Sequence, residues 1–345
     1  MASIPGGQYN VVAPGGQQVN VVMTTDGSNL PPPIPGEFNL EVITDGVVPS
    51  GLPFGYQGVA VLSDGGNTID MAYGNWALQI TGDPTVKGGA GHDTIYAGNA
   101  PASIIGGLGP DLIYGGSGPD TIQGGLGRDT IYGGTGNDTI TGGRGPDTIY
   151  GGSGQNVITG GSGPDLIYGG DGQNTITGGA GPDTIFAGQG GDLITGGNGP
   201  DLIFGGDGPD TINGGFGPDT IYGGDGGTLI HGGAGADQIY LGAGQNTVFG
   251  GSGPDTIDGG SGSNQITTGT GGTLIQDSGE TGHDTVVGFN QAHGDAITFA
   301  GQDAATVDHV VATANSSGGS TVITLPDGST MTLLGITHID STFFH

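Results

Sequence analysis

The chain has 345 residues, of which 84 are glycine, and 33 acidic residues against 3 basic ones give it a formal net charge of −30. Binding to nucleic acid or to an anionic membrane requires Lys and Arg to meet phosphate, so this balance excludes both partners. No apolar run approaches the roughly 20 residues of a membrane helix, so we expect no membrane span. Cysteine is absent, so something other than disulfide bonds must stabilise the fold.

The first 87 residues are the least regular part of the chain. We expect an N-terminal strand arm over residues 1–29, a proline-rich linker over 30–36 and a β-rich cap over 37–87. Two interpretations of the arm stay open. It caps its own chain, or residues 5–22 add as a strand to a neighbouring chain, and repeated addition of that kind builds a filament.

From Gly88 to Gln276 the sequence repeats every nine residues as G-G-x-G-x-D-x-I-x, without a register slip. Ile fills the apolar position from Ile95 to Ile275 except at Val248. A solenoid explains this period: the glycine-rich hexad turns, and the last three residues form a short strand whose middle Ile points inward. The sequence predicts an all-β fold, a parallel β-roll (β-solenoid) over 88–276 with β-rich segments on both sides.

The outward strand residues alternate with a period of 18, so two nonapeptides complete one turn of the roll. One column is mostly Thr and amide, as at Thr141 and Thr159. The other column is aromatic and consists of Tyr96, Tyr114, Tyr132, Tyr150, Tyr168, Phe186, Phe204, Tyr222 and Tyr240. An apolar stripe of this length marks an interaction site, so we assign this aromatic column as an assembly or ligand face.

The hexad Asp residues form two rows. The first row is continuous: Asp93, Asp111, Asp129, Asp147, Asp165, Asp183, Asp201, Asp219, Asp237 and Asp255. The second row holds Asp120, Asp138, Asp192 and Asp210, interrupted by Ala102, Asn156, Asn174, Thr228, Asn246 and Asn264. Like charges stacked about 5 Å apart repel, and calcium bound by carboxylate and turn carbonyl oxygens removes that repulsion. We therefore predict multiple calcium ions at these Asp residues, in one continuous and one interrupted row. In the competing interpretation the Asp side chains only solvate a turn or accept backbone N–H bonds.

The repeat, exemplified by Gly106 to Tyr114, resembles the haemolysin-type calcium-binding repeat of RTX proteins. The resemblance implies a parallel β-roll in which hexad Asp side chains and turn carbonyls bind calcium. Residues 277–345 resemble the cap that follows RTX rolls and an uncleaved type I secretion signal. No basic and then apolar signal sequence begins the chain, so the resemblance implies type I secretion to the extracellular space or cell surface.

The sequence contains no H-E-x-x-H and no G-x-S-x-G motif, and its seven His show no ligand spacing, so we expect no enzyme. It predicts a secreted, calcium-dependent structural protein that self-assembles as a homo-oligomer or filament, surface layer or matrix, as RTX surface-layer proteins do. The alternative is an adhesin or carbohydrate-binding module that holds cell-surface polysaccharide on the aromatic column. Ice binding by the Thr rows ranks third.

Overall fold

The computed structural model describes residues 85–97, 101–279 and 281–345, together with the backbone of six earlier strands. The chain divides into two units, Met1–Leu166 and Ile167–His345, which are described in turn.

Six strands precede residue 85 in unit 1: β1 (Gly7–Val12), β2 (Gln18–Thr24), β3 (Phe38–Ile43), β4 (Gly58–Leu62), β5 (Thr68–Asp70) and β6 (Ala77–Thr81). β1 pairs antiparallel with β2, and β2, β3, β4 and β6 then pair in parallel succession within the chain. The linker predicted over 30–36 lies outside the described residues. Donation of residues 5–22 to a neighbouring chain stays a prediction.

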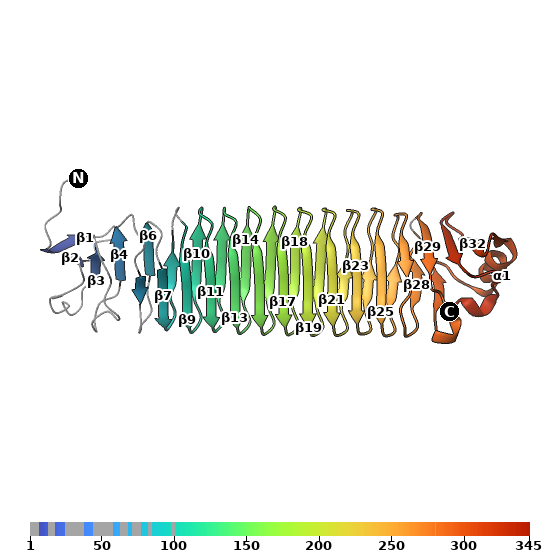
Figure 1. The fold of residues 1–345 in the computed structure, drawn as a ribbon, viewed down its shortest axis with the longest axis horizontal. Coiled ribbons are helices and arrows are strands. Elements are labelled where there is room, and N and C mark those ends of the chain that lie inside the picture. The colour runs from blue at the N-terminus through green and yellow to red at the C-terminus, as the bar shows by residue number, and fades with distance from the viewer. Residues whose placement is uncertain are drawn as a thin grey trace. The chain divides into compact units, whose positions relative to one another are not determined.

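Two parallel sheets form the rest of unit 1 (Figure 1). The aromatic sheet carries the aromatic column, and the hydroxyl sheet carries the Thr and amide column. The aromatic sheet continues from β6 with β8 (Thr94–Tyr96), β10 (Leu112–Gly116), β12 (Thr130–Gly134) and β14 (Thr148–Gly152). The hydroxyl sheet continues from β5 with β7 (Thr85–Ala90), β9 (Ser103–Leu108), β11 (Thr121–Leu126), β13 (Thr139–Arg144) and β15 (Val157–Ser162).

Register within each sheet follows the period of 18. Ile113 lies opposite Ile131 in the aromatic sheet, and Ile122 lies opposite Ile140 in the hydroxyl sheet. These Ile side chains are at most 1 % exposed, whereas both neighbours of each Ile in its strand are partly or fully exposed. The inward Ile ladder and the two-nonapeptide turn are therefore confirmed.

Unit 2 repeats this arrangement after β16 (Leu166–Gly170), which begins at the unit boundary. Its aromatic sheet contains β18 (Thr184–Gly188), β20 (Leu202–Gly206), β22 (Thr220–Tyr222), β24 (Gln238–Tyr240), β26 (Thr256–Asp258), β28 (Leu274–Asp277) and β30 (Ala296–Phe299). Its hydroxyl sheet contains β17 (Thr175–Ala180), β19 (Leu193–Asn198), β21 (Thr211–Phe216), β23 (Leu229–Ala234), β25 (Thr247–Ser252), β27 (Gln265–Thr267), β29 (His283–Val287), β33 (Thr330–Leu334), β32 (Ser320–Thr324) and β31 (Asn315–Ser317). Parallel pairing thus continues past residue 276, because β29 pairs with β27 and β30 with β28.

An apolar cluster closes the C-terminal end of unit 2. Val310, Ile323 and Leu333 are fully buried, and the rings of Phe289 and Phe343 stack with centroids 5.5 Å apart. Two 3-10 turns, η1 (Gln291–His293) and η2 (Ser341–Phe343), and the helix α1 (Ala304–Thr313) interrupt the strands. α1 is the single α-helix among the described residues, so the predicted all-β fold class is confirmed.

Candidate metal centre

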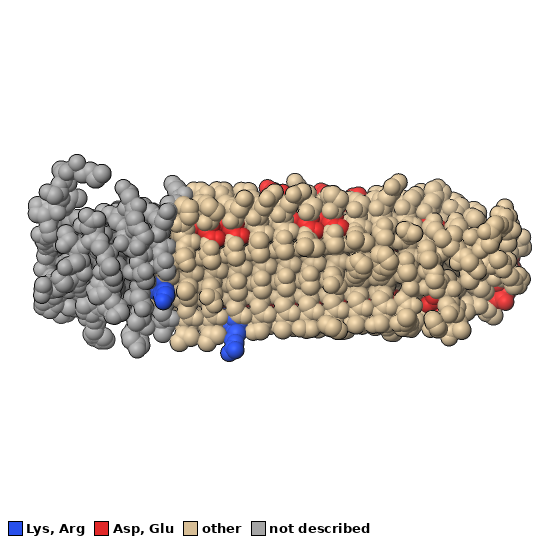
Figure 2. Space-filling model, viewed as in Figure 1, with Lys and Arg blue, Asp and Glu red and all other residues tan. Residues whose placement is uncertain are grey.

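The predicted metal-binding Asp side chains all point into the turns, directly before a strand begins. None of the fourteen is more than 3 % exposed. Figure 2 accordingly shows few acidic groups on its visible face, although the chain carries 33 Asp and Glu residues. A buried carboxylate needs a compensating partner for each oxygen, because desolvating a charge without one is unfavourable by several kcal/mol.

One oxygen of each carboxylate finds its partner in the preceding turn. The backbone N–H of Asp111 donates to Oδ1 of Asp129 at 2.8 Å, and the N–H of Asp129 donates to Oδ1 of Asp147 at 2.8 Å. The second row uses the same bond, for example from the N–H of Asp192 to Oδ1 of Asp210 at 2.7 Å. The competing interpretation of the sequence is thus right for Oδ1, and these bonds tie each turn to the next.

The other oxygen, Oδ2, is buried and accepts no hydrogen bond from any described residue. This holds for eleven of the predicted ligands: Asp111, Asp120, Asp129, Asp138, Asp147, Asp192, Asp201, Asp210, Asp219, Asp237 and Asp255. Native proteins rarely leave buried polar atoms without a partner, and an ion is one recognised reason for such a set.

A backbone carbonyl of the following turn lies close to most of the unsatisfied oxygens. An ideal Cβ on Gly124 would lie 2.5 Å from Oδ2 of Asp129 and 2.6 Å from the carbonyl oxygen of Gly142. The same cradle recurs at Gly106, where both distances, to Asp111 and to Gly124, are 2.5 Å. Two oxygens within about 5 Å of each other can share one calcium ion, because Ca–O distances are about 2.3–2.6 Å. Glycine keeps this cradle open, because a side chain on it would lie between the two oxygens; in the turn of Asp192 the corresponding residue is Ala187.

Burial raises the pKa of these carboxyl groups well above the ordinary 3.8. It brings the pKa of Asp129 to about 6, against the lowering effect of the Asp111 backbone N–H. For Asp147 and Asp219, burial together with the charges of the Asp residues one turn away raises the pKa to about 7. Without a cation, the ionised roll is therefore electrostatically unfavourable.

The donor set fits calcium better than a transition metal. No three His, Cys, Asp or Glu side chains converge anywhere in the described part of the chain. A site must therefore combine one or two carboxylates with backbone carbonyl oxygens, which is the hard, all-oxygen set that calcium prefers. When bound, calcium would supply positive charge between carboxylate and carbonyl oxygens that otherwise face each other without a proton.

Two buried carboxylates continue the rows beyond the regular repeat, and the sequence analysis did not assign them as ligands. Oδ1 of Asp284 accepts from the N–H of Asn264 at 3.2 Å, and Oδ1 of Asp295 accepts from the N–H of Thr273 at 2.8 Å. Their spacings are 20 and 22 residues instead of 18. The signal available in the sequence was the pattern of Asp, any residue, then an aliphatic residue, at Asp284–Val286 and Asp295–Ile297.

The aromatic column forms a stacked ladder within each unit. In unit 1 the rings of Tyr96, Tyr114, Tyr132 and Tyr150 stack with centroids 4.7–4.8 Å apart and planes within 4°. In unit 2, neighbouring rings of Tyr168, Phe186, Phe204, Tyr222 and Tyr240 lie 4.7–5.0 Å apart. Because the ring faces cover one another, mainly ring edges and the Tyr hydroxyls face outward.

Stacked glycine turns, a buried Ile ladder and rows of inward carboxylates define a parallel β-roll of the calcium-binding class. A family profile described as the RTX calcium-binding nonapeptide repeat (4 copies) matches residues 81–100, 105–140, 132–167, 168–203, 204–239, 229–248 and 240–275. These matches cover more than half of the chain, which therefore belongs to this RTX repeat family.

Among solved structures, the chain is similar to the extracellular lipase LipA from Serratia marcescens, at 19% identity and a TM-score of 0.24. The match covers 78% of this chain and 44% of the lipase, so the chain spans less than half the length of that protein. No curated protein matches the chain. Among the described residues, the helices are too short and too polar to span a membrane.

Proposed function

We propose that this protein is a secreted, calcium-dependent structural protein that self-assembles outside the cell into a filament, surface layer or matrix. The observation that carries the calcium dependence is the series of buried Oδ2 atoms without a hydrogen-bond partner, most of them beside a turn carbonyl. The RTX repeat family supports calcium binding and, through its association with type I secretion, an extracellular location.

Charge neutralisation links calcium to assembly. The metal-free chain carries a net charge of −30, which opposes the approach of a second copy. Each bound calcium ion adds two positive charges inside the roll. Loading the rows therefore removes most of this repulsion at the same time as it closes the turns, so that folding and association share one trigger.

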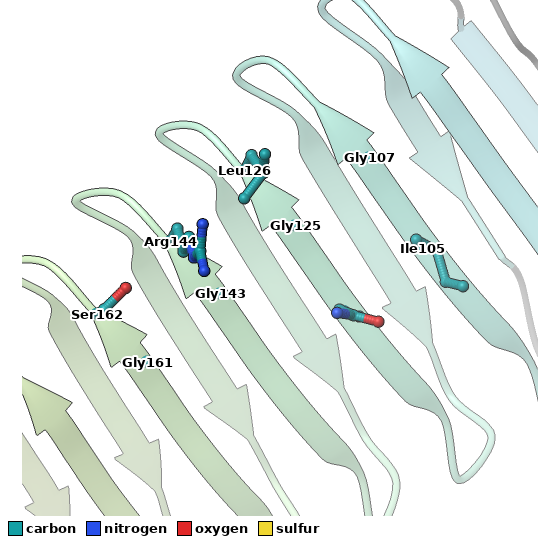
Figure 3. A pocket seen from close by; sticks show the side chains of 9 residues that line it. Ile105, Gly107, Gly125, Leu126, Gly143, Arg144, Gly161 and Ser162 are labelled. Carbon is teal, nitrogen blue, oxygen red and sulfur yellow. The ribbon is translucent and has the colours of Figure 1, made fainter.

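Exposed apolar side chains support a contact between copies. Leu108 and Leu126 face each other across β9 and β11 and are 52% and 43% exposed. Leu126 also lines a shallow groove of about 500 Å³ whose floor is a glycine stripe and whose walls include Ile105 and Arg144 (Figure 3). Phe216 in unit 2 is 67% exposed. Such side chains stabilise an interface when a partner covers them.

The adhesin alternative finds weaker support in the ladder geometry. A sugar ring stacks on the open face of an aromatic ring, whereas the faces in both ladders cover one another. A polysaccharide along the column would meet ring edges and hydroxyls. Ice binding is weaker again, because Gln123, Leu193 and His231 interrupt the Thr rows of the hydroxyl sheet.

Electron microscopy and light scattering of the full chain, with calcium and with EGTA, test the proposal. We expect polymers with calcium and monomers with EGTA. A Leu108→Ser/Leu126→Ser variant should keep the calcium-dependent circular dichroism spectrum and form shorter or fewer polymers. Monomers under both conditions, with retention on a glycan column, would favour the adhesin.

A further inference from the structure

The second Asp row contains turns of a different kind, in which Asn or Thr replaces Asp. Unit 2 has four of them, at Asn174, Thr228, Asn246 and Asn264, and all four side chains are at most 3% exposed. Oδ1 of each of two asparagines still accepts from the preceding turn: the N–H of Thr228 donates to Asn246 at 2.9 Å, and the N–H of Asn246 donates to Asn264 at 3.1 Å. The difference lies at the second side-chain atom.

The Asn amide nitrogen occupies the position that Oδ2 holds in an Asp turn. An ideal Cβ on Gly169 would lie 3.0 Å from Nδ2 of Asn174, just as one on Gly124 would lie 2.5 Å from Oδ2 of Asp129. In both turns the affected glycine is five residues before the Asn or Asp, and the next turn places a carbonyl beside it, from Ala187 and from Gly142. The two turns therefore differ chiefly in the chemistry of one atom.

The Asn amide nitrogen donates hydrogen bonds, which the carboxylate oxygen of an ionised Asp cannot do. Nδ2 of Asn174 donates to the carbonyl oxygen of Gly172 at 2.9 Å, and Nδ2 of Asn264 donates to that of Gly259 at 2.6 Å. The Thr228 hydroxyl donates to the carbonyl of Gly223 at 3.2 Å. These acceptors lie two or five residues before the donor, so carbonyls at both positions point at the second side-chain atom. In an Asp turn, Oδ2 takes this place and cannot donate a hydrogen bond to these carbonyl oxygens.

The amides also connect successive turns directly. Nδ2 of Asn246 donates to Oδ1 of Asn264 at 2.9 Å, and Nδ2 of Asn264 donates to Oδ1 of Asp284 at 2.8 Å. Two ionised carboxylates in these places would repel. A bond from turn to turn along Asn246, Asn264 and Asp284 is therefore possible without any cation.

The residue before the Asn supports a separate class of turn. Pro precedes Asp in many turns, such as Pro209 before Asp210, but no Asn of the second row follows Pro. Gln155, Gln173, Gln245 and Ser263 take that place instead. Pro is thus absent before every Asn of the second row, although Asn137 and Gly191 also precede an Asp.

We propose that the side chains of Asn174, Thr228, Asn246 and Asn264 take the place of calcium in their turns, so that these turns close without metal. This inference rests on the proposed calcium dependence of the Asp turns. Within unit 2 the first row, from Asp183 to Asp255, depends on calcium throughout, whereas the second row depends on it chiefly at Asp210. Loss of calcium would then release one edge of the roll while the Asn and Thr turns hold the other.

Substitutions that convert one kind of turn into the other, made in the full chain, test the inference. The variant Asp138→Asn/Asp210→Asn converts two metal turns, and Asn246→Asp/Asn264→Asp converts two amide turns. Asp138→Ala/Asp210→Ala is the control, because it removes the ion ligand without supplying a donor. Folding is followed by circular dichroism during calcium titration and during melting in EGTA, and bound calcium is counted by equilibrium dialysis.

The Asp-to-Asn variant should bind fewer calcium ions, fold at a lower calcium concentration and melt above the wild type in EGTA by about 2 °C or more. The Asn-to-Asp variant should bind more ions, fold at a higher calcium concentration and lose structure in EGTA. Should Asp138→Asn/Asp210→Asn behave like the Ala control, or Asn246→Asp/Asn264→Asp fold at the same calcium concentration as the wild type, the inference is overturned. A wild type that ignores calcium would instead overturn the proposed function.

Discussion

A methyl group placed in one calcium cradle should remove one ion and little else. Gly124 has no left-handed backbone conformation, so alanine fits its backbone. Its Cβ, however, would lie 2.5 Å from Oδ2 of Asp129 and 2.6 Å from the carbonyl of Gly142, closer than the roughly 3.0 Å below which real Cβ contacts almost never occur. The two oxygens must separate by about 0.5 Å, and the methyl group fills the space between them. We therefore expect Gly124→Ala to lose the ion of this turn.

The loss of stability in Gly124→Ala depends on the calcium concentration. One site that binds only the folded chain stabilises it by about 2.7 kcal/mol at a calcium concentration 100 times its dissociation constant, and by about 4.1 kcal/mol at 1,000 times. The stability deficit of Gly124→Ala relative to wild type should therefore grow by about 1.4 kcal/mol for each tenfold rise in calcium. Urea unfolding followed by circular dichroism, at two calcium concentrations a factor of ten apart, measures both deficits.

Gly191→Ala is the matched control. Gly191 precedes Asp192 in the same kind of turn, and the nearest atom to its Cβ would be the carbonyl oxygen of Pro209 at 3.2 Å, outside any cradle. This variant should follow wild type at both calcium concentrations. A deficit of Gly124→Ala that is the same at both concentrations would show that the methyl group only crowds the turn, and would refute an ion between Asp129 and Gly142.

Three further predictions concern protons, the core and the surface. Without calcium the roll should gain stability as pH falls from about 7 to 4, because burial raises the folded pKa of Asp147, Asp210 and Asp219 to about 7 from 3.8, so the folded chain binds more protons than the unfolded chain in that window. Melting temperatures at pH 7.5 and 4.5, in buffer depleted of calcium by a chelating resin, measure this, and equal values would contradict it. When calcium is present, the same protons compete with the ion, so the calcium affinity measured by titration should decrease as the pH is lowered. Ile149→Ala removes a fully buried side chain and should destabilise the fold by about 2–5 kcal/mol in urea unfolding, whereas the exposed Thr139→Ala should change it by less than about 0.5 kcal/mol.

The repeat made most of the fold predictable. One nonapeptide specifies a turn and a strand, and copies in unbroken register stack by necessity, so the Ile ladder and both Asp rows follow from spacing alone. Prediction failed where the register breaks. Asp284 and Asp295 continue the rows after spacings of 20 and 22 residues, which a search at a period of 18 passes over. The helix α1 follows a capping box formed by Asp303 and Thr306, which lies outside any repeat.

The chemistry inside each turn was only half predictable. Residue type suggested either a calcium ligand or a backbone acceptor for each Asp, and in the structure Oδ1 of Asp129 accepts a backbone bond while Oδ2 has no hydrogen-bond partner. Which atom of an Asn faces the turn carbonyls depends on the orientation of its side chain, and the sequence does not specify that orientation. For the same reason the aromatic column suggested rings whose faces a ligand can reach, whereas the rings of Tyr114 and Tyr132 cover each other's faces.

Calcium dependence of folding is the most direct test of the central claim that a divalent ion joins the stacked Asp turns. Circular dichroism of the full chain should show a β-rich spectrum and a cooperative melt with calcium, and a weaker β signal with a melt at lower temperature after EGTA, with recovery when calcium but not potassium is restored. A spectrum and a melting temperature that EGTA leaves unchanged at neutral pH would mean that the buried carboxylates are stabilised by something other than calcium.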